Sequence, residues 1–289
     1  MRAFRFVKVR DLSEGLSLLA EKGDETAILA GGTDLVIQLK DEEVAPAAVL
    51  DISSLGKLSF IRDDGPELAL GPLATFRDIA ASPLIRQHVP LLAQAASAVG
   101  SPQIRNRGTV GGNLMNASPA ADLLPPLVAL EARATLVSAA GARVLSVEEL
   151  VAGPYRTVRK PDEILTEIRF GKPPTGSGMT FYKLGRRNAL AISRVNLAVI
   201  LTPGPGEVIG RARLSIGSVT PAPWRCREVE SFLGGGPASQ DSFEEAGRLA
   251  AETFVKLAGA RASTNYKRPV VRGLTARILS RAWGEVRPV

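Results

Sequence analysis

Residues 105–122, RNRGTVGGNLMNASPAAD, carry the strongest signal in the chain. They set a glycine pair among hydroxyl and amide side chains, behind two arginines and ahead of one aspartate. A second glycine pair lies upstream in residues 29–36, LAGGTDLV, after an apolar stretch that favours a strand. Glycine lets the backbone approach a ligand closely, and consecutive amides in such a turn attract anions. Interpreted as loops, the two stretches predict a diphosphate site that holds its ligand from two sides. The spacing of their glycines differs from that of a Rossmann fingerprint.

The upstream loop is the weaker half of this prediction. If Thr33 begins a helix, the helix N-terminus adds positive dipole to the amides of residues 30–35. Thr33 can also supply a hydroxyl, and Asp34 can cap the turn. Taken alone, however, the loop is more simply explained as a strand–turn–helix connection, because isolated glycine pairs are common.

The downstream stretch contains more polar groups than a structural loop requires. Its candidate site residues are Thr109, Gly111, Gly112, Asn113, Asn116, Ser118 and Asp122. A carboxylate such as Asp122 suits the hydroxyl groups of a ribose, which donate hydrogen bonds. Arg105 and Arg107 can meet phosphate, or can pair with surface acids. A structural loop needs one or two glycines, so this density of polar groups favours a functional site.

The bulk composition bounds the class of protein. A length of 289 residues favours two domains or one large domain. The single cysteine, Cys226, excludes an internal disulfide and any all-cysteine iron–sulfur or zinc site in this chain, and cytoplasmic residence is the simplest expectation. No apolar run is long enough for a transmembrane helix. The net charge of +7 fits either an acidic partner or a solvated surface, and scattered arginines with few aromatic residues predict no nucleic-acid platform.

The order of expected elements predicts an α+β fold. Strands over 26–30 and 49–52 flank the first glycine pair and form a first lobe that ends near residue 54. Residues 90–99 are a helix candidate, and 134–137 with 143–145 read as a hairpin. The stretch 171–178, GKPPTGSG, is the clearest linker.

Beyond that linker, strands are expected before helices. The strand candidates are 180–184, 195–201 and 211–216, and the helices are expected over about 241–257 and 269–283. Four helix starts place an acidic residue three positions after a capping residue; these capping residues are Asp11, Thr75, Ser146 and Asp241.

The residues quoted so far carry a family resemblance. AGGTDL and IRNRGTVGGNLMNASPAADLLPPLVAL resemble the two FAD motifs of the flavoprotein subunits of the xanthine dehydrogenase family, which includes the medium subunits of aerobic carbon monoxide dehydrogenase and other molybdenum hydroxylases. FRFVKVRDLSEGLSLLA, PDEILTEI and FYKLGRRNALAISRVNLAV resemble further blocks, so the likeness covers almost the whole chain. It implies a two-lobed, PCMH-type FAD-binding domain over 1–175, with lobes of about 1–54 and 55–175, and a C-terminal domain of antiparallel strands packed with helices over 176–289.

The resemblance also implies roles for particular positions. The segment expected to wrap the FAD diphosphate and part of the ribityl chain comprises Ile28, Leu29, Ala30, Gly31, Gly32, Thr33, Asp34 and Leu35. In the second motif, Thr109 would contact the flavin side, and Gly111, Gly112 and Asn113 would hold phosphate or ribityl oxygens.

Four positions outside these two runs are expected near the cofactor as well. Asp122 would bind the adenosine ribose, and Ile104 would line the cofactor cleft. Leu165 would pack near the isoalloxazine ring, and Lys183 would lie on the open side of the flavin. Ile104 and Leu165 are also explained as plain core residues, and Lys183 as a solvated lysine.

Covalent attachment of the flavin is not expected. Such a linkage normally uses a histidine or a cysteine, and His88 and Cys226 both lie outside the two motifs. The FAD should therefore be noncovalent. One cysteine also cannot build the extra iron–sulfur cluster carried by the flavin subunit in the 4-hydroxybenzoyl-CoA reductase branch. The chain itself is expected to hold no metal and to supply no catalytic base or nucleophile.

The resemblance implies an electron-transfer subunit of an oxidoreductase. Molybdopterin would sit on a large partner subunit and [2Fe–2S] clusters on a small one, in a dimer of heterotrimers, a heterohexamer. Electrons would pass from the clusters to FAD here and then to NAD⁺, a quinone or oxygen. Two alternatives are a free-standing FAD oxidoreductase with its own small-molecule substrate and a nucleotide-binding or scaffold subunit without enzymatic activity.

Overall fold

The N-terminal lobe is a small parallel sheet with helices beside it. The computed structural model describes residues 1–259 and 262–287. The sheet has the order β1-β3-β2, formed by Arg5–Lys8, Ala48–Asp51 and Thr26–Leu29. The helices are α1 (Leu12–Lys22) and α2 (Leu35–Lys40), and two short 3₁₀ turns lie at Gly23–Glu25 and Gly56–Leu58. Asp11 caps α1 as expected, because its carboxylate accepts the backbone N–H of Glu14.

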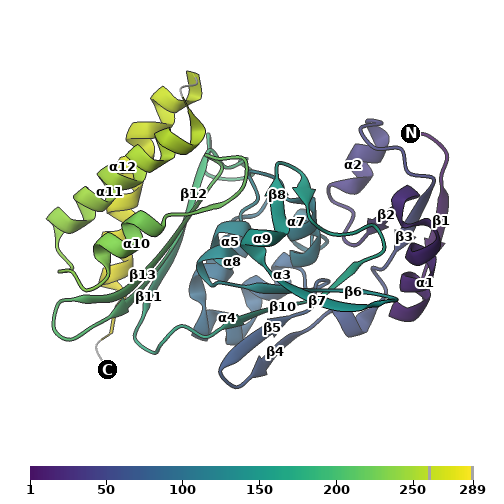
Figure 1. The fold of residues 1–289 in the computed structure, drawn as a ribbon, viewed down its shortest axis with the longest axis horizontal. Coiled ribbons are helices and arrows are strands. Elements are labelled where there is room, and N and C mark those ends of the chain that lie inside the picture. Colours follow the sequence, from purple (N-terminus) through teal and green to yellow (C-terminus); the bar gives the residue numbers. More distant parts are fainter. Residues whose placement is uncertain (260–261, 288–289) are drawn as a thin grey trace.

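The second lobe is a five-stranded antiparallel sheet with several helices, some of which pack between it and the C-terminal domain (Figure 1). Its strand order is β4-β5-β10-β6-β7, formed by Ile61–Asp64, Glu67–Leu70, Ile164–Gly171, Arg133–Ser138 and Gly141–Ser146. The short hairpin β8-β9 comprises Val151–Gly153 and Arg156–Thr157. The helices α3 to α9 are Phe76–Ala81, Pro83–His88, Pro90–Ala98, Pro102–Arg105, Val110–Asn116, Leu124–Ala129 and Val147–Leu150.

The C-terminal domain is a four-stranded antiparallel sheet with three helices on its outer face (Figure 1). Its strands β11 to β14 are Gly178–Leu184, Val195–Pro203, Ile209–Gly217 and Trp224–Arg225. Its helices α10 to α12 are Arg227–Leu233, Gln240–Ala258 and Ala262–Gly284. Residues 260–261 and 288–289 of the domain expected over 176–289 lie outside the described residues.

Strand β12 joins the two domains into one packed body. Alternate side chains of a strand point to opposite faces of its sheet. Val195, Leu197 and Val199 therefore enter the core beneath the C-terminal helices, while Ala198 and Ile200 enter the core of the second lobe. Because both faces are covered, the strand is buried nearly throughout and reads as a continuous apolar run.

Two of the expected helix starts need correction. Thr75 with Asp78 and Ser146 with Glu149 form the capping boxes that were expected. The cap of α11, however, is Ser239, whose hydroxyl accepts the N–H of Ser242, so the expected cap Asp241 lies inside the first turn. An acid there still faces the positive end of the helix dipole, which explains why the pattern was misleading.

The last helix is longer than expected. It begins at Ala262, and Pro269, the expected start, lies inside it. A proline inside a helix costs stability, but α12 packs closely along α11. A Cβ at Gly247 of α11 would clash with the backbone carbonyl of Arg272 in α12, so the two helix backbones are nearly in contact there. This tertiary packing offsets the local cost of the proline.

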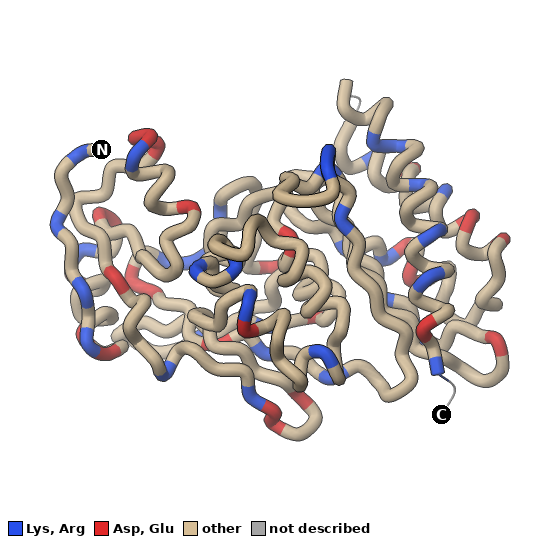
Figure 2. The backbone as a smooth tube through the Cα atoms, turned by 180° about the vertical axis from the view of Figure 1, so that it is seen from behind, with Lys and Arg blue, Asp and Glu red and all other residues tan. Residues whose placement is uncertain are grey.

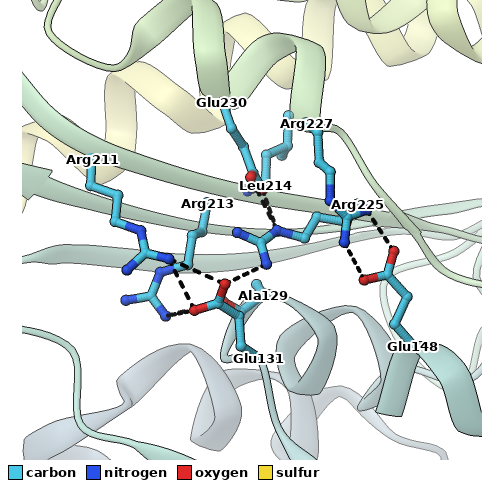
Figure 3. Close-up of polar contacts among 9 residues, drawn as sticks. All are labelled: Ala129, Glu131, Glu148, Arg211, Arg213, Leu214, Arg225, Arg227 and Glu230. Atoms are coloured by element: carbon cyan, nitrogen blue, oxygen red, sulfur yellow. Dashed lines mark hydrogen bonds and ion pairs between the residues drawn. The ribbon is translucent and has the colours of Figure 1, made fainter. Parts of the chain in front are cut away.

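An ion-pair network lies across the boundary between the second lobe and the C-terminal domain (Figure 3). Glu131 lies in the turn after α8. Its carboxylate forms ion pairs with Arg225 at 2.6 Å, Arg211 at 3.1 Å and Arg213 at 3.4 Å. Burial acts to raise the pKa of Glu131, but the hydrogen bond from Arg225 and the three guanidinium charges outweigh it and hold that pKa below its usual range. A second pair, Arg227 with Glu148, crosses the same boundary at 2.6 Å.

Charged positions of both signs are spread along the backbone. Figure 2 shows lysines and arginines interspersed with acidic residues over both domains. Within the described residues, no helix combines the length and the apolar character needed to cross a bilayer.

Candidate functional site

A cavity of about 290 Å³ opens between the two lobes of the first domain. The N-terminal lobe lines it with the loop that joins β2 to α2, together with Ala27, Ile28, Gln38 and Ile52. The second lobe contributes Pro72, Leu73, Thr109, Gly111, Gly112, Asn113, Met115, Asn116, Arg159, Ile164 and Leu165. Both glycine motifs therefore face one pocket, although they are about 80 residues apart in the sequence.

The first motif is an open loop with available backbone donors. The backbone N–H groups of residues 30–35 donate no hydrogen bond to any described residue. Gly32 has a φ of +77°, in the left-handed region that favours glycine. A Cβ at Gly31 would clash with the backbone carbonyl of Arg107, so this glycine allows the two lobes to meet. Consecutive free amides in such a loop are an anion-binding arrangement.

The second motif is a helix, which corrects the expectation of a second amide-lined loop. Thr109 is the N-cap of α7, and its hydroxyl accepts the N–H of Gly112 at 3.0 Å. The N–H groups of Val110 and Gly111 donate to the carbonyls of Ala74 and Pro72 at 3.0 and 2.9 Å. Since these donors are already used within the protein, the second motif offers the pocket side chains rather than amides.

Asn113 is the side chain of α7 whose hydrogen bonding is incomplete. Its amide oxygen is buried and has no hydrogen-bond partner among the described residues. A buried acceptor without a donor is costly, and Asn113 lines the pocket, so this residue is a candidate for a contact with a ligand that donates a hydrogen bond.

Asp34 ties the two motifs together. Its carboxylate accepts the side-chain amide of Asn116 at 3.0 Å and the hydroxyl of Thr33 at 3.2 Å. Gln38 donates to the amide oxygen of Asn116 at 3.5 Å. These contacts run from the N-terminal lobe to α7, so they hold the two sides of the pocket at a fixed separation.

Four expected site residues lie outside the pocket lining: Leu29, Ile104, Asp122 and Lys183. Leu29 and Ile104 pack against the glycine turns at Gly32 and Gly100.

Asp122 and Lys183 lie elsewhere, paired with each other at 2.5 Å between the second lobe and the C-terminal domain. The other oxygen of Asp122 accepts Ser193 at 2.6 Å and Asn196 at 3.0 Å, and Lys183 also donates to the carbonyl of Ala98 at 3.0 Å. Asp122 is only 5% exposed, and both of its carboxylate oxygens are engaged within the protein. Lys183 is not a solvated lysine either, because its side chain is 13% exposed.

Arg159 is a pocket residue that sequence reasoning missed. Its Nη1 atom donates to the carbonyls of Lys160, Pro161 and Glu163 at 2.9, 3.1 and 2.8 Å. Burial lowers the pKa of its guanidinium, while the charges of Glu163 and Asp162 act in the opposite direction. The one available signal was position, because Arg159 stands just before the PDEIL block.

The single cysteine, Cys226, does not line the pocket. Cys226 is fully buried, and burial raises the pKa of its thiol to about 12, which makes it unreactive. Within the described ranges, no group of three or more histidine, cysteine, aspartate or glutamate side chains is placed to hold a metal ion.

Fold and site define a class of protein, an α+β chain whose first domain presents an open anion cradle in a pocket between two lobes. Residues 2–173 match the family described as the FAD binding domain in molybdopterin dehydrogenase, and residues 180–282 match the CO dehydrogenase flavoprotein C-terminal domain. The chain belongs to this family of FAD-binding oxidoreductase subunits.

Individual relatives extend the match over almost the full chain. The nicotinate dehydrogenase FAD-subunit of Eubacterium barkeri is 36% identical and aligns with 95% of this chain and 94% of its own length. The carbon monoxide dehydrogenase medium chain of Hydrogenophaga pseudoflava is 27% identical, with 97% of each chain covered. A solved structure of carbon monoxide dehydrogenase from Hydrogenophaga pseudoflava superposes with a TM-score of 0.93 at 26% identity, covering 99% of both chains. These matches confirm the resemblance and the α+β fold with an FAD-binding domain first.

Proposed function

We propose that this chain holds FAD in the pocket between its two lobes and relays electrons from [2Fe–2S] clusters of a partner subunit to an external acceptor. The observation that carries the placement is the open run of amides over residues 30–35, which faces a cavity that is also lined by Asn113, a residue whose amide oxygen is unpartnered. The first can hold an anion, and the second needs a donor.

The parts of FAD match this arrangement. The amides of residues 30–35 would hold the diphosphate, and the amide oxygen of Asn113 would accept a ribityl hydroxyl. Ile28, Leu73 and Leu165 supply apolar wall for the uncharged parts of the cofactor. Bound FAD supplies the chemistry, because it can take up electrons from one partner and give them to another. The protein binds and orients it, and the site residues need no acid or base.

The cavity is small for a whole dinucleotide. Ligand pockets commonly span about 300–1,000 Å³, and this one lies at the lower end at about 290 Å³. We infer that the lobes enclose the centre of the cofactor and leave one end outside, where an electron donor or acceptor can approach.

The proposed assembly follows the names of the relatives. They are described as an FAD-subunit, a medium chain and a subunit of a dehydrogenase complex. We infer a large molybdopterin-binding partner and a small [2Fe–2S] partner, arranged as a dimer of heterotrimers. The domain boundary between residues 175 and 176 and residence in the cytoplasm are part of the same proposal.

Purification of the native complex, with metal and flavin analysis, tests this function. We expect molybdenum, iron and about one FAD per chain to co-purify. A complex with neither metal would contradict the proposal. If substrate bleached the flavin of the isolated chain, the free-standing oxidoreductase would be favoured, and a colourless chain that takes up no FAD would favour the scaffold.

A further inference from the structure

Arg159 brings a positive charge to the pocket wall, and the mechanism so far has not used it. It lies between β9 and β10, two residues after the end of β9 and five residues before the start of β10, where Ile164 and Leu165 line the pocket. Its Nη1 atom is fixed by the carbonyls of Lys160, Pro161 and Glu163 at 2.8 to 3.1 Å. Three bonds to one backbone turn hold the guanidinium plane in one orientation. The charge is therefore positioned before any ligand arrives.

Arg159 forms no ion pair with any residue in the described part of the chain, although the charges of Asp162 and Glu163 act on it from nearby. Of the two acids that follow it in the sequence, Asp162 and Glu163, the second is already engaged by Arg143 at 2.5 and 2.8 Å and by the N–H of Lys160 at 2.7 Å. A half-buried guanidinium without a carboxylate is unfavourable unless an anion joins it.

Arg159 also retains free donors. Its Nε and Nη2 atoms donate to no acceptor among residues 1–259 and 262–287, and neither is a buried unsatisfied atom. Guanidinium N–H groups in a fixed plane match the paired oxygens of a phosphate better than any other side chain. The other charged residue of the lining is Asp34, whose carboxylate is occupied by Asn116 and Thr33.

We propose that Arg159 is a cofactor-binding residue that donates its free N–H groups to the FAD diphosphate from the second lobe. The diphosphate is then held by amides of the 30–35 loop on one lobe and by a guanidinium on the other. This inference rests on the proposed binding of FAD in this pocket. It adds an electrostatic contribution from the second lobe to the binding of the cofactor.

Titration of the cofactor-free full-length chain with FAD at low and high salt tests the role of Arg159. The variants are R159Q, which removes the charge, and R159K, which keeps the charge but loses the planar fork. R159Q should raise the Kd for FAD about tenfold or more and flatten its salt dependence. R159K should retain the salt dependence with an intermediate Kd. Riboflavin, which lacks the diphosphate, should bind both variants and the unmodified chain with the same Kd.

R156Q is the matched control. Arg156 is an exposed arginine of β9, three residues before Arg159, and it does not line the pocket. An equal loss of FAD affinity in R156Q, or an unchanged salt dependence in R159Q, would show that Arg159 has no specific contact with the diphosphate and would overturn the inference. Failure of the unmodified chain to bind FAD would instead count against the proposed function.

Discussion

Gly112 faces the pocket with no side chain of its own. A Cβ built there would touch only the hydroxyl of Thr109, at 3.0 Å, and would otherwise point into open space. Because Gly112 lines the cavity, that open space is the space we assign to FAD. The residue therefore separates folding from cofactor binding better than Gly31 or Gly111, where an added Cβ would clash with the protein itself.

Gly112→Val should fold and lose FAD. The valine side chain would occupy volume that the cofactor needs, while the protein gives way by only a few tenths of an ångström at Thr109. Flavin absorbance per chain after purification gives the stoichiometry, and thermal unfolding checks the fold. Gly171→Val is the control, since a Cβ there meets no atom within 4 Å and the residue does not line the pocket. Stoichiometric FAD in a folded Gly112→Val chain would refute the placement.

Substitution of Asn113 should affect the cofactor-free protein and the FAD-bound protein in different ways. Without cofactor its buried amide oxygen is unsatisfied, so Asn113→Leu should leave the cofactor-free chain as stable as before or slightly more stable. With FAD, loss of one hydrogen bond should weaken binding by about 1.4 kcal/mol, about tenfold in Kd. Denaturant unfolding and FAD titration measure the two effects. A destabilised cofactor-free chain with unchanged affinity would show that Asn113 serves the fold.

At the scale of elements, α7 shows how the second glycine motif works. The helix has seven residues, and its first turn is held by the Thr109 cap and by carbonyls of the segment before α3. Gly111 permits this approach, because a Cβ there would lie 2.5 Å from the ring of Pro72. The glycine pair thus seats a short helix against its neighbour and leaves Asn113 and Asn116 directed to the pocket side.

Thr109→Val should weaken the start of α7. It removes the hydroxyl that accepts the N–H of Gly112 and keeps the side-chain volume, so we expect a loss of about 1 kcal/mol in the free energy of unfolding. Thr109→Ser retains the hydroxyl and should stay close to the unmodified chain. Chemical denaturation of the three proteins makes the comparison. Equal stability of the valine and threonine chains would mean that the cap contributes nothing.

At the scale of the whole molecule, polar contacts fix the domains relative to each other. Asp122 and Lys183 form a nearly buried pair, so Asp122→Asn would leave an unpaired buried ammonium. We expect a loss of about 3 kcal/mol in the free energy of unfolding, with FAD affinity in the surviving folded fraction unchanged. Calorimetry and flavin titration of the purified chain test this. A selective loss of FAD affinity with normal stability would return Asp122 to the cofactor site.

The Glu131 network predicts acid sensitivity. The folded pKa of Glu131 lies below its ordinary value of 4.5, so its contribution is present above pH 4.5 and is lost as the pH falls through the folded pKa. Because its side chain is 40% exposed, we expect only about 1 kcal/mol. Glu131→Gln should lower stability at pH 7 and show a shallower decline below pH 4.5. Parallel pH curves for the two proteins, measured by denaturant unfolding, would contradict this.

Much of the fold and part of the site could be predicted from the sequence because the signals are local. Glycine positions, capping pairs and the alternation of apolar residues each depend on a few neighbours, and they located α1, α3, β12 and the loop at residues 30–35. The strand β1 gave no such signal, since its residues are mostly exposed and it is held by pairing with β3. The full length of α12 could not be predicted from local rules either, because those rules end or begin a helix at a proline. Here, packing against α11 offsets the cost of the internal proline.

The sequence by itself determined the class of protein and the presence of two glycine motifs, and it predicted that both motifs serve one cofactor. Only the tertiary structure decided which groups each motif offers to a ligand. The backbone amides of the first motif remain free, while those of the second donate to the capping hydroxyl of Thr109 and to the carbonyls of Ala74 and Pro72. Likewise, Asp122 and Lys183 became partners of each other and Arg159 became part of the pocket. The physical reason is that hydrogen-bond partners and burial are set by segments distant in sequence, which no short pattern records.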